Sequence, residues 1–369
     1  MKRRQFVQSA ALVPFAGFES PASTAAPTPA NAWEKAQLYP GELALYEAAR
    51  KEREVVSWDT GPTWANWKAL FDAFSKRYPG IKLHYNDLGS AATAAALVKS
   101  RRRPQADTAY YFAASAVEAV DQGVVAPFKP IHFDTLPEVF RDPEGKWFTV
   151  HTLNLAFVVN KKLVRNTPTS WADLLKPEYN SSIVYLDPRS AGVGQVVAFA
   201  AAYANGGSVD DVKPGINYLK KLHATGNVLR TEGITPYSKF MKGEIPIWIS
   251  YENDGLKAKY TEKGMTDVID VVIPKEASVA APYGISLVKN GPHPNAGKLW
   301  LNFIMSKIGQ QLFAEGFVRP SVKSIPLPPD IQQKMPEAPQ IRPLDVIKAS
   351  ARKSEVDRLW AKAVLINNS

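Results

Sequence analysis

Apolar and polar positions along the first third of the chain alternate between the periods of strands and helices. Two apolar runs of strand length flank residues 67–78, where apolar residues recur at helical spacing until Pro79 and Gly80 end the pattern. Two strands joined by a helix are typical of a parallel crossover unit, which has helices on the faces of its sheet. The predicted elements here are strands at 54–59, 81–86 and 107–112, a helix near 91–101 and a short helix that ends at Gly123.

A second series of the same kind begins with a long apolar strand predicted at 149–160. Ser170 is a suitable N-cap for a helical turn at 170–175. Residues 320–343 contain seven prolines, so we expect this segment to run extended over the surface without regular structure. The other predicted elements are strands at 183–186, 245–251, 268–273 and 284–289, and helices at 193–203, 214–223, 255–263, 296–313 and 345–364. We therefore predict an α/β protein. Its 369 residues exceed the ~250–300 that a single hydrophobic core supports, so we expect two lobes.

The N-terminus has the layout of a cleavable export signal. Three basic residues at 2–4 precede a short apolar stretch at 10–18, and small residues and prolines follow. The apolar stretch is much shorter than the roughly 20 residues that span a bilayer, so no membrane anchor is expected. The paired arginines followed by Phe6 favour twin-arginine export, with general secretion as the alternative. We predict that residues 1–32 are removed and that the mature protein acts in the periplasm.

Composition removes several classes of function. The chain has no cysteine, which excludes a lipid on a thiol, disulfides, a thiolate nucleophile and a cysteine-ligated zinc. The formal net charge is +10, and removal of 1–32 would lower it to +8 because that segment holds three basic residues and Glu19. The one dense basic run, 99–103, is interpreted as a solvated helix end, where cations complement the helix dipole. We expect a monomer with no nucleic-acid partner.

Four stretches in the second part of the chain occur in a characteristic order. They are 168–175 (PTSWADLL), 243–247 (GEIPI) with 251–253 (YEN), 292–296 (PHPNA) with Ser306 and Gln310-Gln311 beyond it, and 317–320 (FVRP). Together they resemble the type 2 periplasmic solute-binding proteins of ABC importers. The resemblance is to the branch that includes iron, thiamine, polyamine and 2-aminoethylphosphonate binders.

The resemblance implies two α/β lobes joined by two strand crossovers, near Thr152 and near 280–283, with the ligand in the cleft between them. Lobe one would comprise residues 33–151 and 281–322, and lobe two residues 152–280 and 323–369. Such lobes close on the ligand by hinge motion, and the membrane transporter recognises the closed form. The implied partners are a small-molecule solute and the permease of an ABC transporter.

Ligands of open α/β sheets lie beyond the carboxyl ends of the strands, which directs attention to two loops in lobe one. The loop after the first strand offers a hydroxyl and a glycine backbone, and an indole that is either a cleft wall or a packed aromatic. Three successive aromatic residues end the third strand, and we expect two of them to face the cleft and at least one to lie in the core. The candidates are Thr60, Gly61, Trp64, Tyr110, Tyr111 and Phe112.

Two further loops in lobe two carry candidates of a different chemistry. The small residues at 190–192 leave backbone N–H groups open at a helix start, which favours an anion site; the alternative is that Ser190 only caps the helix. The loop at 251–254 follows a strand and brings two carboxylates near the cleft, of which Glu252 is the better candidate to hold an amine. The alternative is that this carboxylate is simply solvated. The candidates here and at the second crossover are Ser190, Ala191, Gly192, Tyr251, Glu252, Asn253 and Tyr283.

An anion site, aromatic walls and a carboxylate suit a small zwitterion or organic anion, such as an aminoalkylphosphonate. Ferric binders of the branch carry adjacent tyrosines after the lobe-two strand, where this chain has only Tyr251. A polyamine is the second hypothesis, because Asp59 and Asp254 add further carboxylates. No metal or other cofactor is expected.

An enzyme is the alternative from another class, since Asp59 and Glu252 on facing loops have the residue types of a glycosidase pair. Against it, the five histidines are scattered and neither H-E-x-x-H nor G-x-S-x-G occurs. A structural or adhesive protein would show repeats or all-β alternation, and neither is present. We therefore expect a binding protein and no enzyme.

Overall fold

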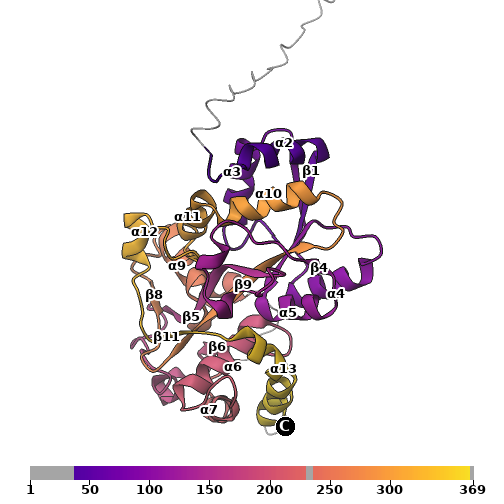
Figure 1. Ribbon diagram of the computed structural model, residues 1–369. Helices are drawn as coiled ribbons and strands as arrows, with labels where there is room; N and C mark the ends of the chain where they lie inside the picture. Colours follow the sequence, from indigo (N-terminus) through magenta and orange to yellow (C-terminus); the bar gives the residue numbers. More distant parts are fainter. Residues whose placement is uncertain (1–36, 230–235, 366–369) are drawn as a thin grey trace, which may run out of the picture. The chain divides into compact units, whose positions relative to one another are not determined.

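The computed structural model describes residues 37–229 and 236–365, so the predicted export signal at 1–32 lies outside the described residues. Within them, eleven strands join in one mixed sheet, whose main order is β2-β1-β3-β9-β5-β7-β6 (Figure 1). The strands are β1 Glu54–Trp58, β2 Lys82–Tyr85, β3 Thr108–Phe112, β4 Val125–Ala126, β5 Phe148–Asn160, β6 Ile183–Val184, β7 Ile247–Tyr251, β8 Ile269–Val272, β9 Ser278–Val288, β10 Arg319–Pro320 and β11 Ile341–Pro343. The α-helices are α2 Glu42–Glu52, α3 Trp67–Arg77, α4 Ser90–Ser100, α5 Ala113–Asp121, α6 Gly192–Ala204, α7 Lys213–Ala224, α8 Pro236–Met241, α9 Glu252–Thr261, α10 Pro294–Met305, α11 Lys307–Glu315, α12 Pro329–Lys334 and α13 Val346–Trp360.

The first predicted crossover unit is confirmed. β1 pairs in parallel with β2 on one side and with β3 on the other. α3, which connects β1 to β2, buries the apolar face that the helical spacing predicted. This face includes Trp67, Leu70 and Phe74, each of which is fully buried. Burial of each of these side chains contributes roughly 1.5–3 kcal/mol to folding. The basic run at 99–103 lies at the end of α4 with its charged side chains exposed, as predicted.

The two longest strands, β5 and β9, connect the two halves of the sheet. Residues 148–154 of β5 pair antiparallel with 280–285 of β9, and residues 155–160 continue along β7 and β8. β9 in turn pairs with β3 over its second half. These strands therefore pass between the β2-β1-β3 group and the β7-β6 group at Thr152 and Pro282, where the resemblance implies the crossovers. The lobe boundaries themselves stay a prediction.

Several predicted elements are wrong in detail. β9 begins six residues before the strand predicted at 284–289. The helix predicted at 296–313 is two helices, because Ser306 interrupts it and its hydroxyl caps α11 by accepting a hydrogen bond from the Gly309 N–H (3.3 Å). The turn after Ser170 is only a 3-10 helix, Asp173–Leu175, although the Ser170 hydroxyl does accept from the Asp173 N–H (3.0 Å) as a cap. α2, α8 and α12 were not predicted.

The proline-rich segment 320–343 is not without regular structure, which corrects the prediction. It contains α12 and β11, and β11 pairs in parallel with β9. Pro329 is the first residue of α12, a position that needs no N–H donor, and Pro343 ends β11. The number of prolines was therefore a poor guide, because their positions within the elements decide whether they interrupt them.

None of the helices in the described ranges is both long and apolar enough to cross a membrane.

Candidate functional site

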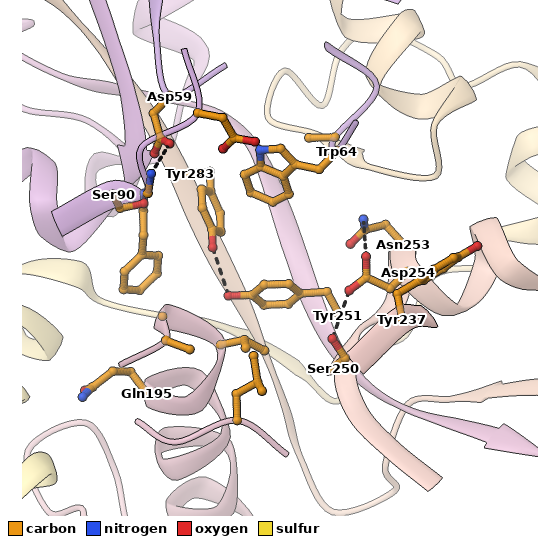
Figure 2. Close-up of a pocket in the computed structure, with 18 of the residues that line it drawn as sticks. Asp59, Trp64, Ser90, Gln195, Tyr237, Ser250, Tyr251, Asn253, Asp254 and Tyr283 are labelled. Atoms are coloured by element: carbon orange, nitrogen blue, oxygen red, sulfur yellow. Dashed lines mark hydrogen bonds between the residues drawn. The ribbon is translucent and has the colours of Figure 1, made fainter. Parts of the chain in front are cut away.

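The structure contains a cleft of about 1150 Å³. One of its sides is formed by the β1–α3 loop together with the first residues of α4 and α5. The other side is formed by the first residues of α6 and by the junction between β7 and α9. Figure 2 shows its wall, with Asp59, Ser90 and Trp64 along one side and Gln195 and Ser250 on the other. Tyr283 from β9 and Tyr251 from the end of β7 meet between these two sides. The cleft therefore lies at the crossover strands.

Several helices begin at the cleft. Its lining includes Ser90 at the start of α4, Ser115 in the first turn of α5 and Gly192 at the start of α6. The first N–H groups of a helix lack intrahelical partners, and the aligned peptide dipoles place a partial positive charge there. The convergence of these helix starts makes the cleft favourable for a negatively charged group.

The α6 start is shaped by glycine. A Cβ atom on Gly194 would collide with the backbone of Leu186 and Asp187, so the first turn of α6 packs directly on the preceding loop. A Cβ atom on Gly192 would lie 3.8 Å from the Tyr283 hydroxyl and 3.9 Å from the Phe112 ring. The backbone of the α6 start is therefore open toward these two side chains.

Tyr251 and Tyr283 form a phenol pair at the centre of the cleft. Their hydroxyl oxygens lie 3.3 Å apart, and Trp64 packs edge-on against Tyr283 with ring centroids 5.1 Å apart (Figure 2). Burial raises the pKa of both phenols above the usual value for tyrosine. Both hydroxyls therefore stay protonated at neutral pH. The hydrogen bond between them uses one O–H group, so the other can donate to a ligand.

Two of the carboxylates that line the cleft, those of Asp254 and Asp59, have raised pKa values. Asp254 lies in the first turn of α9, where its Oδ2 accepts from the Ser250 hydroxyl (3.0 Å), and burial raises its pKa to about 6. Asp59 follows β1, where its Oδ1 accepts from the Gly89 N–H (2.7 Å), and burial raises its pKa to about 7. Both groups therefore titrate near neutral pH.

Eight of the thirteen predicted site residues line the cleft. They are Trp64, Phe112, Ser190, Ala191, Gly192, Tyr251, Asn253 and Tyr283. Their part in ligand binding stays a prediction. The Ser190 hydroxyl donates to the Asp187 carbonyl (3.3 Å), while its N–H bonds the same carbonyl, so this residue belongs to the turn before α6.

The other five predicted residues lie outside the cleft lining. The Thr60 hydroxyl is buried and donates to the Ser57 carbonyl (3.1 Å). A Cβ atom on Gly61 would collide with the Asp87 carboxylate, so that backbone faces a side chain of its own chain.

Of the three aromatic residues at 110–112, only Phe112 reaches the cleft, and not two as expected. Tyr110 and Tyr111 are completely buried, with hydroxyls bonded to His151 Nε2 (2.7 Å) and to the Ser286 hydroxyl (2.6 Å).

Glu252 is the clearest correction. Its carboxylate turns away from the cleft and accepts two hydrogen bonds from Arg319, at 2.8 Å each, and one from Asn154 at 2.9 Å. Asp254, two residues later, is the carboxylate of this loop that lines the cleft.

Sequence reasoning also missed part of the lining. Gly89 and Ser90 and, after β3, Ala114 and Ser115 place small residues at a helix start, which is the same signal that was recognised at 190–192. The other lining residues not selected include Arg189, Gln195, Tyr237, Lys257 and Lys353. Gln195 lies in the first turn of α6 beyond the residues recognised at 190–192, and Lys353 comes from a helix interior, so the sequence carries no comparable signal at either position.

Comparison with known proteins identifies the family. The chain matches the family described as bacterial extracellular solute-binding protein over residues 106–349. It is 27% identical over 256 residues to a Salmonella typhimurium protein provisionally named as 2-aminoethylphosphonate-binding and periplasmic, covering 68% of this chain and 72% of that one. It is 25% identical over 290 residues to the spermidine/putrescine-binding periplasmic protein of Escherichia coli K12, covering 74% and 79%.

A solved structure supports the fold. The periplasmic binding protein AfuA from Actinobacillus pleuropneumoniae, with fructose-6-phosphate bound, superposes with a TM-score of 0.69 at 22% identity, covering 85% of this chain and 99% of AfuA. The fold is that of the type 2 periplasmic binding proteins. With the family match over 106–349, the chain belongs to the bacterial extracellular solute-binding proteins and is the substrate-binding component of an ABC importer.

Proposed function

We propose that the protein captures a small organic anion or zwitterion in the periplasm, with an aminoalkylphosphonate as the representative ligand, and delivers it as a monomer to the membrane permease. One observation carries the proposal: helix starts and a phenol pair surround one part of the cleft, while Asp254 lies beside it on α9. The two parts suit the two charged ends of a zwitterion.

The anionic end is supported by the donors around the phenol pair. The α6 start faces the Tyr283 hydroxyl, and Ser90 at the α4 start lines the same cleft. Hydrogen bonds from N–H and O–H donors to an ionised phosphonate are roughly twice as strong as neutral ones. A phosphonate has three oxygens to accept from such a set.

The ammonium end is supported by acceptors in the first turn of α9. The Asp254 carboxylate lines the cleft, and among the described residues the buried Asn253 Oδ1 has no hydrogen-bond partner. An acceptor without a partner beside a carboxylate suits an ammonium group, which offers three donors.

A polyamine is the second candidate, because Asp59, Asp87, Asp254 and Glu315 all line the cleft. Arg189, Lys257 and Lys353 line it as well, and these cations oppose a ligand that carries only positive charge. Ferric iron is less favoured, because the raised pKa of both cleft phenols opposes the phenolate form that a metal needs.

The test is isothermal titration of the purified protein with 2-aminoethylphosphonate, spermidine, fructose 6-phosphate and ferric citrate. We expect saturable 1:1 binding of the aminophosphonate. At a ligand concentration 100 times Kd, the free energy of unfolding should rise by about 2.7 kcal/mol. Binding of spermidine alone, or turnover of a glycoside without saturable binding, would contradict the proposal.

A pair of tyrosine variants ties binding to the cleft. Tyr283→Phe removes a hydroxyl from the phenol pair and should weaken aminophosphonate binding tenfold or more, because a hydrogen bond to a charged group is worth ~1.5–3 kcal/mol. Tyr85→Phe is the matched control, since Tyr85 is 48% exposed and is not part of the cleft lining. Equal affinities for the two variants would place the ligand elsewhere.

A further inference from the structure

The last α-helix of the described residues, α13, contributes to the cleft. Ala349, Lys353, Asp357 and Trp360 follow one another at spacings of four, four and three residues, so they lie along one face of the helix. Ala349 and Lys353 line the cleft. No sequence pattern predicted that this helix lies at the site.

This face of α13 is joined to the first turns of α6 through a shared carboxylate. Asp357 Oδ1 accepts from Gln195 Nε2 (2.6 Å), and Asp357 Oδ2 accepts from Lys353 Nζ (2.7 Å). Gln195 is buried in α6, three residues after Gly192. The Asp357 carboxylate therefore connects the Lys353 ammonium group to the start of α6, which favours anions.

The same face also contacts the loop before α6. Trp360 Nε1 donates to the Tyr185 hydroxyl (2.9 Å), and the Arg189 guanidinium lies 5.3 Å from the centroid of the Trp360 ring. Arg189 is paired with Asp187 at 2.6 Å. Two cations, Arg189 and Lys353, thus flank the α6 start, and each has a carboxylate partner.

The beginning of α13 contacts the opposite wall. Val346 belongs to a buried cluster with Ala113, Ala116 and Ala119 of α5, and α5 begins at the cleft. α13 therefore packs against the α5 wall at its start and against the α6 wall toward its end.

We propose that α13 is part of the ligand site and that Lys353 is a specificity-determining residue, which favours a doubly charged phosphorus oxyanion over a carboxylate. This inference rests on the proposed function. The Lys353 side chain is 51% exposed, so its ammonium group can leave Asp357 for a ligand at the α6 start. A dianion competes with Asp357 for Lys353 better than a monoanion does, because the attraction scales with charge.

The test compares two ligands that differ only in the anionic group, 2-aminoethylphosphonate and β-alanine, at pH 8, where a phosphorus oxyanion carries about two negative charges. Lys353→Gln should weaken phosphonate binding about tenfold and β-alanine binding less than twofold, and it should reduce the salt dependence of phosphonate binding. Lys353→Arg keeps the charge and should restore most of the affinity.

Lys348→Gln is the matched control. Lys348 lies on the same helix, is also 51% exposed and also pairs with an aspartate at 2.7 Å, but its partner is Asp210 and it does not line the cleft. Its phosphonate affinity should equal that of the wild type. Both variants are expected to keep the melting temperature of the wild type within a few degrees, since exposed ion pairs contribute about 0–1 kcal/mol.

Three results would overturn the inference. Unchanged phosphonate affinity in Lys353→Gln, an equal loss for both ligands, or the same loss in Lys348→Gln would each remove the proposed role of Lys353. These results differ from failure of the proposed function, in which the wild-type protein itself binds neither ligand. That outcome would overturn both proposals together.

Discussion

At the scale of single residues, Asp59 and Asp254 make the stability of the protein depend on pH. Burial raises the pKa of Asp59 to about 7 and that of Asp254 to about 6, from an ordinary value near 4. Asp87 adds to the shift of Asp59, while the Leu88 and Gly89 N–H groups and the Ser90 hydroxyl oppose it. The Ser250 hydroxyl and Lys257 oppose the shift of Asp254.

The expected result follows from the sign of these shifts. A carboxyl whose pKa is higher in the folded state stabilises the fold below the unfolded pKa, and this contribution is lost as pH rises from about 4 to about 6 for Asp254 and to about 7 for Asp59. Urea unfolding of the ligand-free protein should show this loss, and Asp59→Asn should flatten the profile between about pH 4 and 7. An identical profile for Asp59→Asn would contradict the assignment.

The sequence did not determine which side chains of the candidate loops face the cleft. It placed the carboxyl-bearing loop after β7 correctly, but Glu252 and Asp254 differ by two positions at a helix start, which turns their side chains to different sides. The choice depends on Arg319, 67 residues away, which pairs with Glu252. Likewise, β3 is buried on both faces, so Tyr110 and Tyr111 had no direction that period-two alternation could reveal.

At the scale of elements, the Arg319–Glu252 ion pair fixes the start of α9. Arg319 lies on β10, which pairs with β5 beside the crossover at Thr152, while Glu252 begins α9. Both side chains are at most 7% exposed. The pair therefore connects the crossover to the turn that carries Asn253 and Asp254 into the cleft.

Removal of one member of this pair should be costly. Arg319→Met leaves a buried carboxylate without its partner and should lower the free energy of unfolding by about 3–5 kcal/mol at pH 7, as measured by urea denaturation. Arg352→Met is the control, because Arg352 is 42% exposed in its pair with Glu355 and should cost less than about 1 kcal/mol. Equal losses in the two variants would show that the Arg319 pair does not fix α9.

Elements were predicted well where periodicity was long and poorly where single residues decide. α3 and β5 were recognised because their burial follows one period over many residues. The break between α10 and α11 depends on one hydroxyl, that of Ser306, and α12 depends on Pro329 standing at a helix start.

At the scale of the whole molecule, β5 and β9 connect the β2-β1-β3 group to the β7-β6 group. A hinge motion that closes the cleft would therefore bend these two strands. The phenol pair joins Tyr251 at the end of β7 to Tyr283 on β9 beside Phe112 of β3, so a ligand bound at this pair would contact β7 and the crossover strand β9. We expect saturating ligand to reduce the radius of gyration measured by small-angle X-ray scattering. An unchanged radius with ligand bound would contradict hinge closure, and β-alanine below its Kd serves as the control.

The α/β order and the crossovers were recoverable from the sequence, because alternating periods and the family resemblance act over long stretches. The position of α13 was not recoverable. Its packing depends on separate contacts with α5 and with Tyr185 and Gln195, more than 150 residues earlier in the chain, and no local pattern encodes them.

α13 packs against both walls of the cleft, and this limits which chimeras of this protein and other family members can keep a native binding site. A chimera that exchanges one wall of the cleft with that of another family member would leave residues 346–360 facing a surface with which they were not selected. Val346 would meet a foreign α5, or Asp357 and Trp360 a foreign α6 and its loop. Exchange of binding specificity between such proteins therefore has three segments to transfer, the two walls and the helix that joins them.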